Sequence, residues 1–186
     1  MPETTPTPSK VRFNLKNVYY SKISDTGTYG TPVAIPGAVS MDLSANGDLQ
    51  VFYADGVKYY IGQNNNGYSG SLEVAKIPEQ MLKDIWGISE TSDNVLKETI
   101  NDKISSFALL YKVETDQGDE DYVFYCCTAK RPTLSGKTNE GNKNISTQSI
   151  EIECTGNATG LVKCSTQQAT SSTTKAGWFS TVYIPA

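Results

Sequence analysis

The sequence predicts a mainly β fold: a β-sandwich, or antiparallel sheets that form a barrel, with one flanking α-helix. Several runs of the chain alternate apolar and polar residues with the period of two that is typical of a strand. Asn46-Gly47 and Asp55-Gly56 indicate two-residue hairpin turns, because these residue types tolerate the positive φ that such turns require. A strong helical pattern is found at residues 78–86. Together these observations predict antiparallel pairing and a helix that covers one face or end of a sheet.

The N-terminal half is expected to be an arm followed by short strands. Residues 1–10, rich in Pro and Thr, predict a flexible arm, and residues 11–186 predict a single domain. Residues 63–70, with three asparagines and two glycines, predict a loop. Strand patterns are found at residues 12–20, around 31–35, and at 39–43, 49–54 and 72–75.

The turn at Asp55-Gly56 sets the expected pairing of the hairpin around it. Counting outward from the turn places Phe52 opposite Tyr59 and Val51 opposite Tyr60. Both faces of the hairpin then carry aromatic rings, whereas a strand with one face in water alternates apolar and polar residues. Each face therefore needs a cover, and the helix at 78–86 is the expected cover of one face.

Two residues frame this helix. Pro78 suits the first helical position, and Gly87 suits the position just past the end. We expect an apolar stripe to pack against a sheet. The stripe consists of Met81, Leu82, Ile85 and Trp86.

The second half of the chain returns to strand patterns, some of them without a polar face. An alternating strand is expected at 107–113 and a polar loop at 131–149. Two further strands, at 121–128 and at 178–184, are expected to be apolar on both faces.

Glu151 and Glu153 alternate with Ile150 and Ile152, which predicts a strand with one wet face. Two carboxylates are also the residues that glycoside hydrolysis uses, but such pairs flank a substrate cleft. The wet strand face is therefore the favoured interpretation.

The amino-acid composition excludes several classes of function. With a net charge of −4 and no run of lysine and arginine, the chain lacks the positive surface that tight binding of nucleic acid requires. It has no histidine, which excludes histidine-dependent triads and most catalytic zinc sites. We expect neither a signal peptide nor a membrane span. A structural or binding protein without a cofactor is predicted, rather than an enzyme.

Two groups of residues leave alternatives open. The 4 cysteines contain no CxxC pair, so a zinc site would need all of them to converge, and reduced buried thiols are favoured. Cys154 and Cys164 flank a turn at 156–160 and are candidates to lie opposite one another, in an open redox state. The acidic turn offers the oxygen ligands of a calcium ion, although a solvated turn explains it as well. It contains Asp116, Asp119, Glu120 and Asp121.

Segments spread along the whole chain carry a resemblance to a known family. They are "LKNVYYSKISDTGTYGTPVAIPGAVSMDLS" (15–44), "FYADG" (52–56), "SGSLEVAKIPEQMLKDIWG" (69–87), "FALLYKVE" with "YVFYCCTAKRPTLSGKT" (107–138) and "GWFSTVYIP" (177–185). In their order they resemble the major tail (tail-tube) proteins of long-tailed, siphovirus-type bacteriophages. Loops such as residues 63–67 depart from the family in length and composition.

The resemblance implies the phage tail-tube fold, two packed antiparallel sheets flanked by a helix. It implies that subunits form hexameric rings that stack into a tube around a tape-measure protein, between tail terminator and distal tail proteins. The acidic lumen of such a tube conducts genomic DNA into the host cell without binding it specifically. The protein would then be part of the virion, assembled in the host bacterial cytoplasm, without a membrane partner.

The resemblance also gives roles to individual residues. Glu151 and Glu153 are expected to face the lumen, and a neighbouring subunit is expected to cover the second face of the hairpin. The arm at 1–10 is a candidate to reach the next ring. The candidate contacts between subunits or rings are Tyr53, Tyr60, Asn64, Asn65, Asn66 and Tyr68.

The alternative function is a carbohydrate- or host-surface-binding β-sandwich module of a phage or bacterium. It is favoured by the 11 tyrosines and by the loops rich in Asn, Ser and Thr. An enzyme would need a mechanism that uses carboxylates alone.

Overall fold

The computed structural model describes residues 9–136, 138 and 145–185, and this part of the chain is mainly β with antiparallel sheets, as the sequence predicts. Most of the expected arm lies outside the described residues. The strands are β1 (Arg12–Lys22), β2 (Val33–Ala34), β3 (Ala38–Ala45), β4 (Leu49–Ala54), β5 (Val57–Gln63), β6 (Tyr68–Val74), β7 (Ser89–Glu90), β8 (Leu96–Lys97), β9 (Phe107–Thr115), β10 (Gly118–Ala129), β11 (Gln148–Thr155) and β12 (Lys163–Ser165), and the helices are α1 (Glu79–Trp86) and α2 (Ser172–Gly177).

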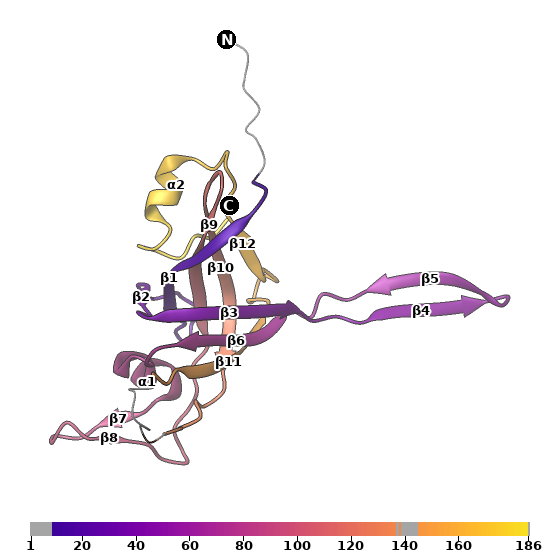
Figure 1. Ribbon diagram of the computed structural model, residues 1–186. Coiled ribbons are helices and arrows are strands. Elements are labelled where there is room, and N and C mark those ends of the chain that lie inside the picture. Colours follow the sequence, from indigo (N-terminus) through magenta and orange to yellow (C-terminus); the bar gives the residue numbers. More distant parts are fainter. Residues whose placement is uncertain (1–8, 137, 139–144, 186) are drawn as a thin grey trace, which may run out of the picture.

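One sheet of eight strands runs in the order β2-β1-β9-β10-β11-β6-β3, with β12 attached to β10 (Figure 1). β10 pairs with β12 through residues 122–124 and with β11 through residues 126–129, while β9 runs along its other edge. The sheet therefore bends along β10, and in Figure 1 β9 and β10 cross β3, β6 and β11. β1 and β3, near the two ends of the sheet, come close to each other, so the bent sheet encloses a core.

The main core lies between the two halves of the bent sheet. Its fully buried residues include Tyr20 of β1, Phe107 and Leu109 of β9, Leu72 of β6 and Ile150 of β11. Alternate residues of these strands point into this core, as the sequence pattern predicts.

α1 closes one end of the main core. Pro78 precedes the helix in an extended conformation, one position earlier than expected, and Gly87 follows it with φ of 71°, in the left-handed region that glycine favours. The apolar stripe packs against the main core; Met81, Ile85 and Trp86 are buried and Leu82 is half-buried. Within the described residues, no helix is long and apolar enough to cross a membrane.

A second core lies on the other face of β9 and β10. Leu110 of β9 and Val123 and Tyr125 of β10 are fully buried there. The C-terminal segment covers them with Trp178, whose indole Nε1 donates a hydrogen bond of 3.3 Å to the carbonyl of Tyr122. The apolar second face of residues 121–128 is therefore covered by the chain itself and needs no neighbouring subunit.

The prediction of a strand at 178–184 is wrong. Residues 172–177 form α2, where the hydroxyl of Ser171 caps the helix by accepting a hydrogen bond of 3.2 Å from the amide of Thr174. The chain then continues as turn and coil, held where the hydroxyl of Tyr125 donates to the carbonyl of Tyr183 over 2.7 Å. These apolar residues cover the second core and do not pair with a neighbouring strand. A short apolar run in a sequence is compatible with either arrangement.

Candidate assembly surfaces

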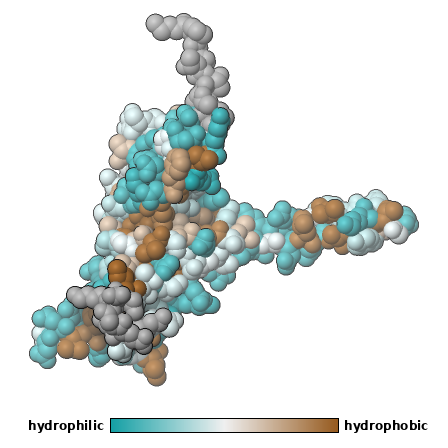
Figure 2. Space-filling view, viewed as in Figure 1, coloured by the Kyte–Doolittle hydropathy of each residue, from teal (hydrophilic) through white to brown (hydrophobic). Residues whose placement is uncertain are grey.

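β4 and β5 form a hairpin that projects from the body of the protein (Figure 1). Its apolar side chains are exposed along its length, as the brown residues of Figure 2 show. Tyr53, Tyr59 and Tyr60 have exposed fractions of 59%, 72% and 63%. The other exposed apolar residues are Leu49, Val51, Phe52, Val57 and Ile61. α1 packs on the main core instead, so the expectation that it covers one face of this hairpin is wrong.

The turn of the hairpin follows the prediction, but its register does not. Asp55 and Gly56 have φ of 52° and 77°, as a type I′ turn requires. Beyond the two pairs nearest the turn, Tyr59 is an extra residue on β5. Phe52 consequently lies opposite Tyr60 and Val51 opposite Ile61, so the expected pairs Phe52–Tyr59 and Val51–Tyr60 are wrong. A one-residue bulge of this kind shifts every later pair.

Asn64, Asn65 and Asn66 form the neck of the hairpin, and all three are exposed. The amide of Asn66 donates to the carbonyl of Asn46 over 2.9 Å, and the amide of Asn46 donates to the carbonyl of Gly67 over 2.8 Å. Backbone hydrogen bonds thus join the two sides of the neck where they leave the body. β6 begins at residue 68, so the loop is shorter than the expected 63–70. Contact of these asparagines with another subunit stays a prediction.

Tyr68 already has partners within the chain. Its ring stands edge-on to Phe124, with centroids 5.2 Å apart, and Lys163 Nζ lies 4.5 Å from its centroid. The rings of Tyr111 and Tyr122 stack nearby at 5.0 Å. These side chains line an open groove of about 450 Å³ between β1 and β3. The ring of Tyr68 therefore points to this groove rather than along the hairpin.

The outer face of β3, β6 and β11 carries hydroxyl and carboxylate side chains in three successive rows. The rows are Ser40–Glu73–Ser149, Asp42–Ser71–Glu151 and Ser44–Ser69–Glu153. We call these nine residues the polar face; none of them is buried. The intervening residues Met41, Leu72 and Ile150 pack into the main core. The sequence pattern identified only the two glutamates of β11, although the same alternation at 40–44, at 69–73 and at Ser149 could have identified the rest.

The carboxylates of the polar face differ in their partners. Glu151 and Glu153 are both exposed, and Lys130 Nζ lies 2.6 Å from Glu151 Oε2. Glu73 accepts hydrogen bonds from the hydroxyls of Thr147 and Ser40, which hold the pKa of its carboxyl below the ordinary value. An open trough of about 610 Å³ lies over β6 and β11. That Glu151 and Glu153 face a lumen stays a prediction.

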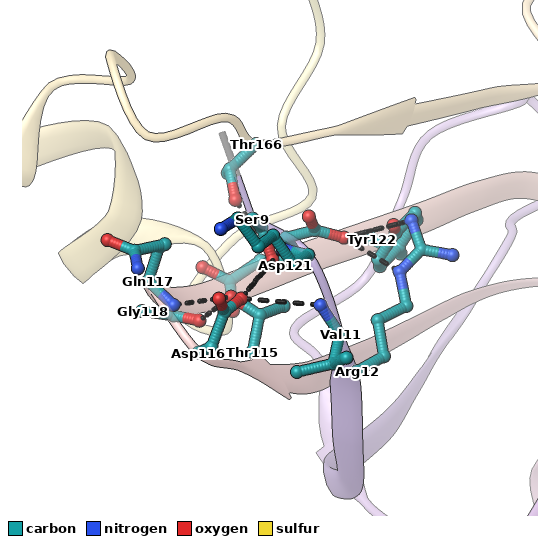
Figure 3. A network of polar contacts seen from close by, with 12 residues as sticks. Ser9, Val11, Arg12, Thr115, Asp116, Gln117, Gly118, Asp121, Tyr122 and Thr166 are labelled. Atoms are coloured by element: carbon teal, nitrogen blue, oxygen red, sulfur yellow. Dashed lines mark hydrogen bonds and ion pairs between the residues drawn. The ribbon is translucent and has the colours of Figure 1, made fainter. Parts of the chain in front are cut away.

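The acidic turn between β9 and β10 holds the N-terminal segment. Asp116 Oδ1 accepts hydrogen bonds from the amide of Lys10 at 2.9 Å, the hydroxyl of Ser9 at 3.0 Å and the amide of Val11 at 3.4 Å (Figure 3). These bonds, the one from the Lys10 amide above all, lower the pKa of Asp116. Glu120 pairs with Arg12 instead, at 3.1 Å. Asp116 and Glu120 thus have separate partners.

Asp121 is the buried member of this turn, with an exposed fraction of 1%. Its Oδ1 accepts no hydrogen bond from the described residues, and Lys112 Nζ lies 3.6 Å away. The same Nζ is 2.9 Å from Asp119 Oδ2, so Lys112 serves two carboxylates. Burial raises the pKa of Asp121, and Lys112 opposes that rise. In the part of the chain that is described, no cluster of three Cys, Asp or Glu could hold a metal ion.

The cysteines do not converge on one point. Cys127 and Cys154 lie opposite each other on β10 and β11, and both are fully buried in the main core. Cys164 lies on β12 opposite Val123, beside the second core, and Cys126 is half-buried. The expectation that Cys154 lies opposite Cys164 is therefore wrong.

Neither the family models nor the curated proteins that were compared with this chain match it.

Proposed function

We propose that this chain is the major subunit of a bacteriophage tail tube. The observation that carries the proposal is the β4–β5 hairpin, an apolar element that projects from the body with both faces exposed. A two-stranded hairpin is at best marginally stable by itself in water, and contiguous exposed apolar surface marks a site of protein contact. The hairpin is therefore interpreted as an arm that a neighbouring copy of the chain covers.

The polar face supports a conduit. It presents five serine hydroxyls and the carboxylates of Asp42, Glu73, Glu151 and Glu153 on one side of a sheet. Carboxylates repel the phosphates of DNA, and binding of DNA by counterion release needs lysine or arginine. Among the described residues that line the trough over this face, Lys130 is the one such residue. Such a surface would let a polyanion pass without holding it.

In this proposal the subunits form hexameric rings that stack around a tape-measure protein, with tail terminator and distal tail proteins at the two ends. The assembled tube belongs to the virion, after assembly in the cytoplasm of the host bacterium. The chain has a mechanical role and no catalytic one, in keeping with its lack of histidine.

Electron microscopy of the concentrated protein tests this proposal. We expect rings or tubes in which β4 and β5 lie at subunit boundaries, and a helical reconstruction in which Glu151 and Glu153 face the lumen. Discrete monomers at every concentration and salt condition would refute the assembly. A tube with both glutamates on the outer wall would refute the conduit surface.

The second candidate, a carbohydrate-binding module, is favoured by the aromatic groove between β1 and β3. Sugars stack on open ring faces, yet here Tyr111 already stacks between Tyr122 at 5.0 Å and Phe124 at 6.2 Å. Arg12 lies over the ring of Tyr122, and Lys163 lies over the ring of Tyr68, which itself packs edge-on against Phe124. Because these ring faces have partners within the chain, we rank this function second. Saturable binding of an oligosaccharide by the monomer would reverse that ranking.

A further inference from the structure

Cys127 and Cys154 are cross-strand neighbours in the main core. The register of β10 and β11 sets them directly opposite each other, and their Sγ atoms are 2.7 Å apart. Residues directly opposite on antiparallel strands have Cα atoms about 4.5–5.5 Å apart, a spacing that a disulfide can bridge. Both thiols are free in the structure.

A bulge decides which of the two adjacent cysteines takes this position. The register of β10 against β9 shifts between Phe124 and Cys127. Strict alternation would direct Phe124 and Cys126 to the same face. With the extra residue, Phe124 and Cys127 both face the main core, while Cys126 stays half-buried outside it. The bulge therefore brings Cys127, and not Cys126, against Cys154.

We propose that Cys127 and Cys154 form the one disulfide of this chain under oxidising conditions. Cys164 lies opposite Val123, three residues or ~10 Å along β10 from Cys126, which is too far for a disulfide, and neither Cys126 nor Cys164 is in the main core with the proposed pair. The two thiols lose two protons and two electrons as the S–S bond forms. Oxidised glutathione takes them up and is cleaved to two molecules of reduced glutathione. In a reducing cytosol the same pair remains as thiols. The inference does not depend on the proposed function.

Burial governs when the bond can form. It raises the pKa of the Cys127 thiol well above the ordinary value, and the thiolate is the form that attacks a disulfide. Exchange in the folded protein is therefore slow, and the cross-link forms while the chain folds. The bond joins positions 27 apart in the sequence and restricts the unfolded chain, which would raise the melting temperature by about 5–10 °C.

Refolding of the full chain from denaturant in a buffer of reduced and oxidised glutathione tests the inference. Free thiols are then alkylated in denaturant, where buried thiols become accessible, and intact mass and peptide mapping locate the cross-link. We expect alkylation of Cys126 and Cys164 alone, a link between Cys127 and Cys154, and a melting temperature that falls by about 5–10 °C when a reductant is added. Cys154→Ser should lose both the link and this difference.

The variant with Cys126→Ser and Cys164→Ser keeps only the proposed pair and alters neither of the two core thiols. We expect it to form the link as the natural chain does. Protein that has refolded to its native structure but then shows four alkylated thiols would overturn the inference. A main product that links Cys126 or Cys164 would do the same. So would a folded double variant that forms no link.

Discussion

Replacement of the hairpin tyrosines separates assembly from folding. Tyr53→Ser and Tyr60→Ser together remove one ring from each of β4 and β5. These side chains are 59% and 63% exposed in the single chain. Surface substitutions of this kind change the free energy of unfolding by about 0.5 kcal/mol or less. The melting temperature of the monomer should therefore stay within about 2 °C of the natural value.

The expected effect on assembly is much larger. An aromatic side chain buries about 150–250 Å² when it is fully covered. Covering the exposed 59% and 63% of these side chains would remove ~120 Å² per tyrosine from water. At ~25 cal/mol per Å² this amounts to ~3 kcal/mol for each ring. Since ~1.4 kcal/mol corresponds to a factor of ten, the double variant should weaken a contact made through both rings by up to ~10⁴-fold.

Light scattering and negative-stain microscopy measure assembly, and a thermal melt of dilute protein measures folding. Lys58→Ser is the matched control, because it truncates an exposed polar residue of the same hairpin and should assemble normally. Assembly of the double variant at the concentration that suffices for the natural protein would refute the role of the hairpin. A large fall in the melting temperature of the monomer would show that the rings are covered from within.

Further substitutions test the fold and the N-terminal segment. Trp86→Phe removes the indole that donates a 3.0 Å hydrogen bond to the carbonyl just past β10, and urea unfolding should show a loss of ~1–2 kcal/mol. Gly70→Ala would place a Cβ 1.8 Å from a backbone carbonyl of β3 and should cost ~3 kcal/mol in the same assay. At Gly136 a Cβ would meet no atom within 4 Å among the described residues beyond its chain neighbours, so Gly136→Ala should be neutral. The pKa of Asp116 is lowered in the folded protein, so its contribution to stability is present above the unfolded value of ~3.9 and is lost as the pH falls through the folded value. The amide chemical shifts of residues 10–11 should change as this contribution is lost, and Asp116→Ala should cause the same change at pH 7. Shifts that acid leaves unchanged would contradict the hydrogen bonds from residues 9–11 to Asp116.

The outcome for the strands shows what a periodic pattern can and cannot predict. Alternation at Ile150, Ile152 and Cys154 correctly predicted a strand with one buried face. The pattern did not reveal the extra residue at Tyr59, because a bulge adds an unpaired residue to the strand and leaves the apolar character of the run unchanged. The same limit applies to Cys127, since a bulge also sets which face it takes.

Strands without a polar face proved to be of two kinds. Residues 121–128 are covered within the chain, where Trp178 packs over Tyr125 and its neighbours. The hairpin residues have no such cover among the described residues. Sequence composition does not separate these cases, because the covering segment at 178–184 and a strand share the same apolar run. Only the tertiary arrangement shows which apolar surface remains for a partner.

The two candidate surfaces belong to the same pair of strands. β3 and β6 are two of the three strands of the polar face, and they continue into the hairpin through its neck, residues 46–48 and 64–67 (Figure 1). The neck is short, and two backbone hydrogen bonds through Asn46 join its two sides next to the body, so the hairpin leaves the body close to the direction of the strands that bear Asp42 and Ser71. A neighbour that covers the hairpin therefore also limits how the polar faces of adjacent subunits can be oriented. In the proposed tube, assembly through this arm and a continuous polar surface are consequently one geometric requirement, and a substitution that redirects the neck should disturb both together.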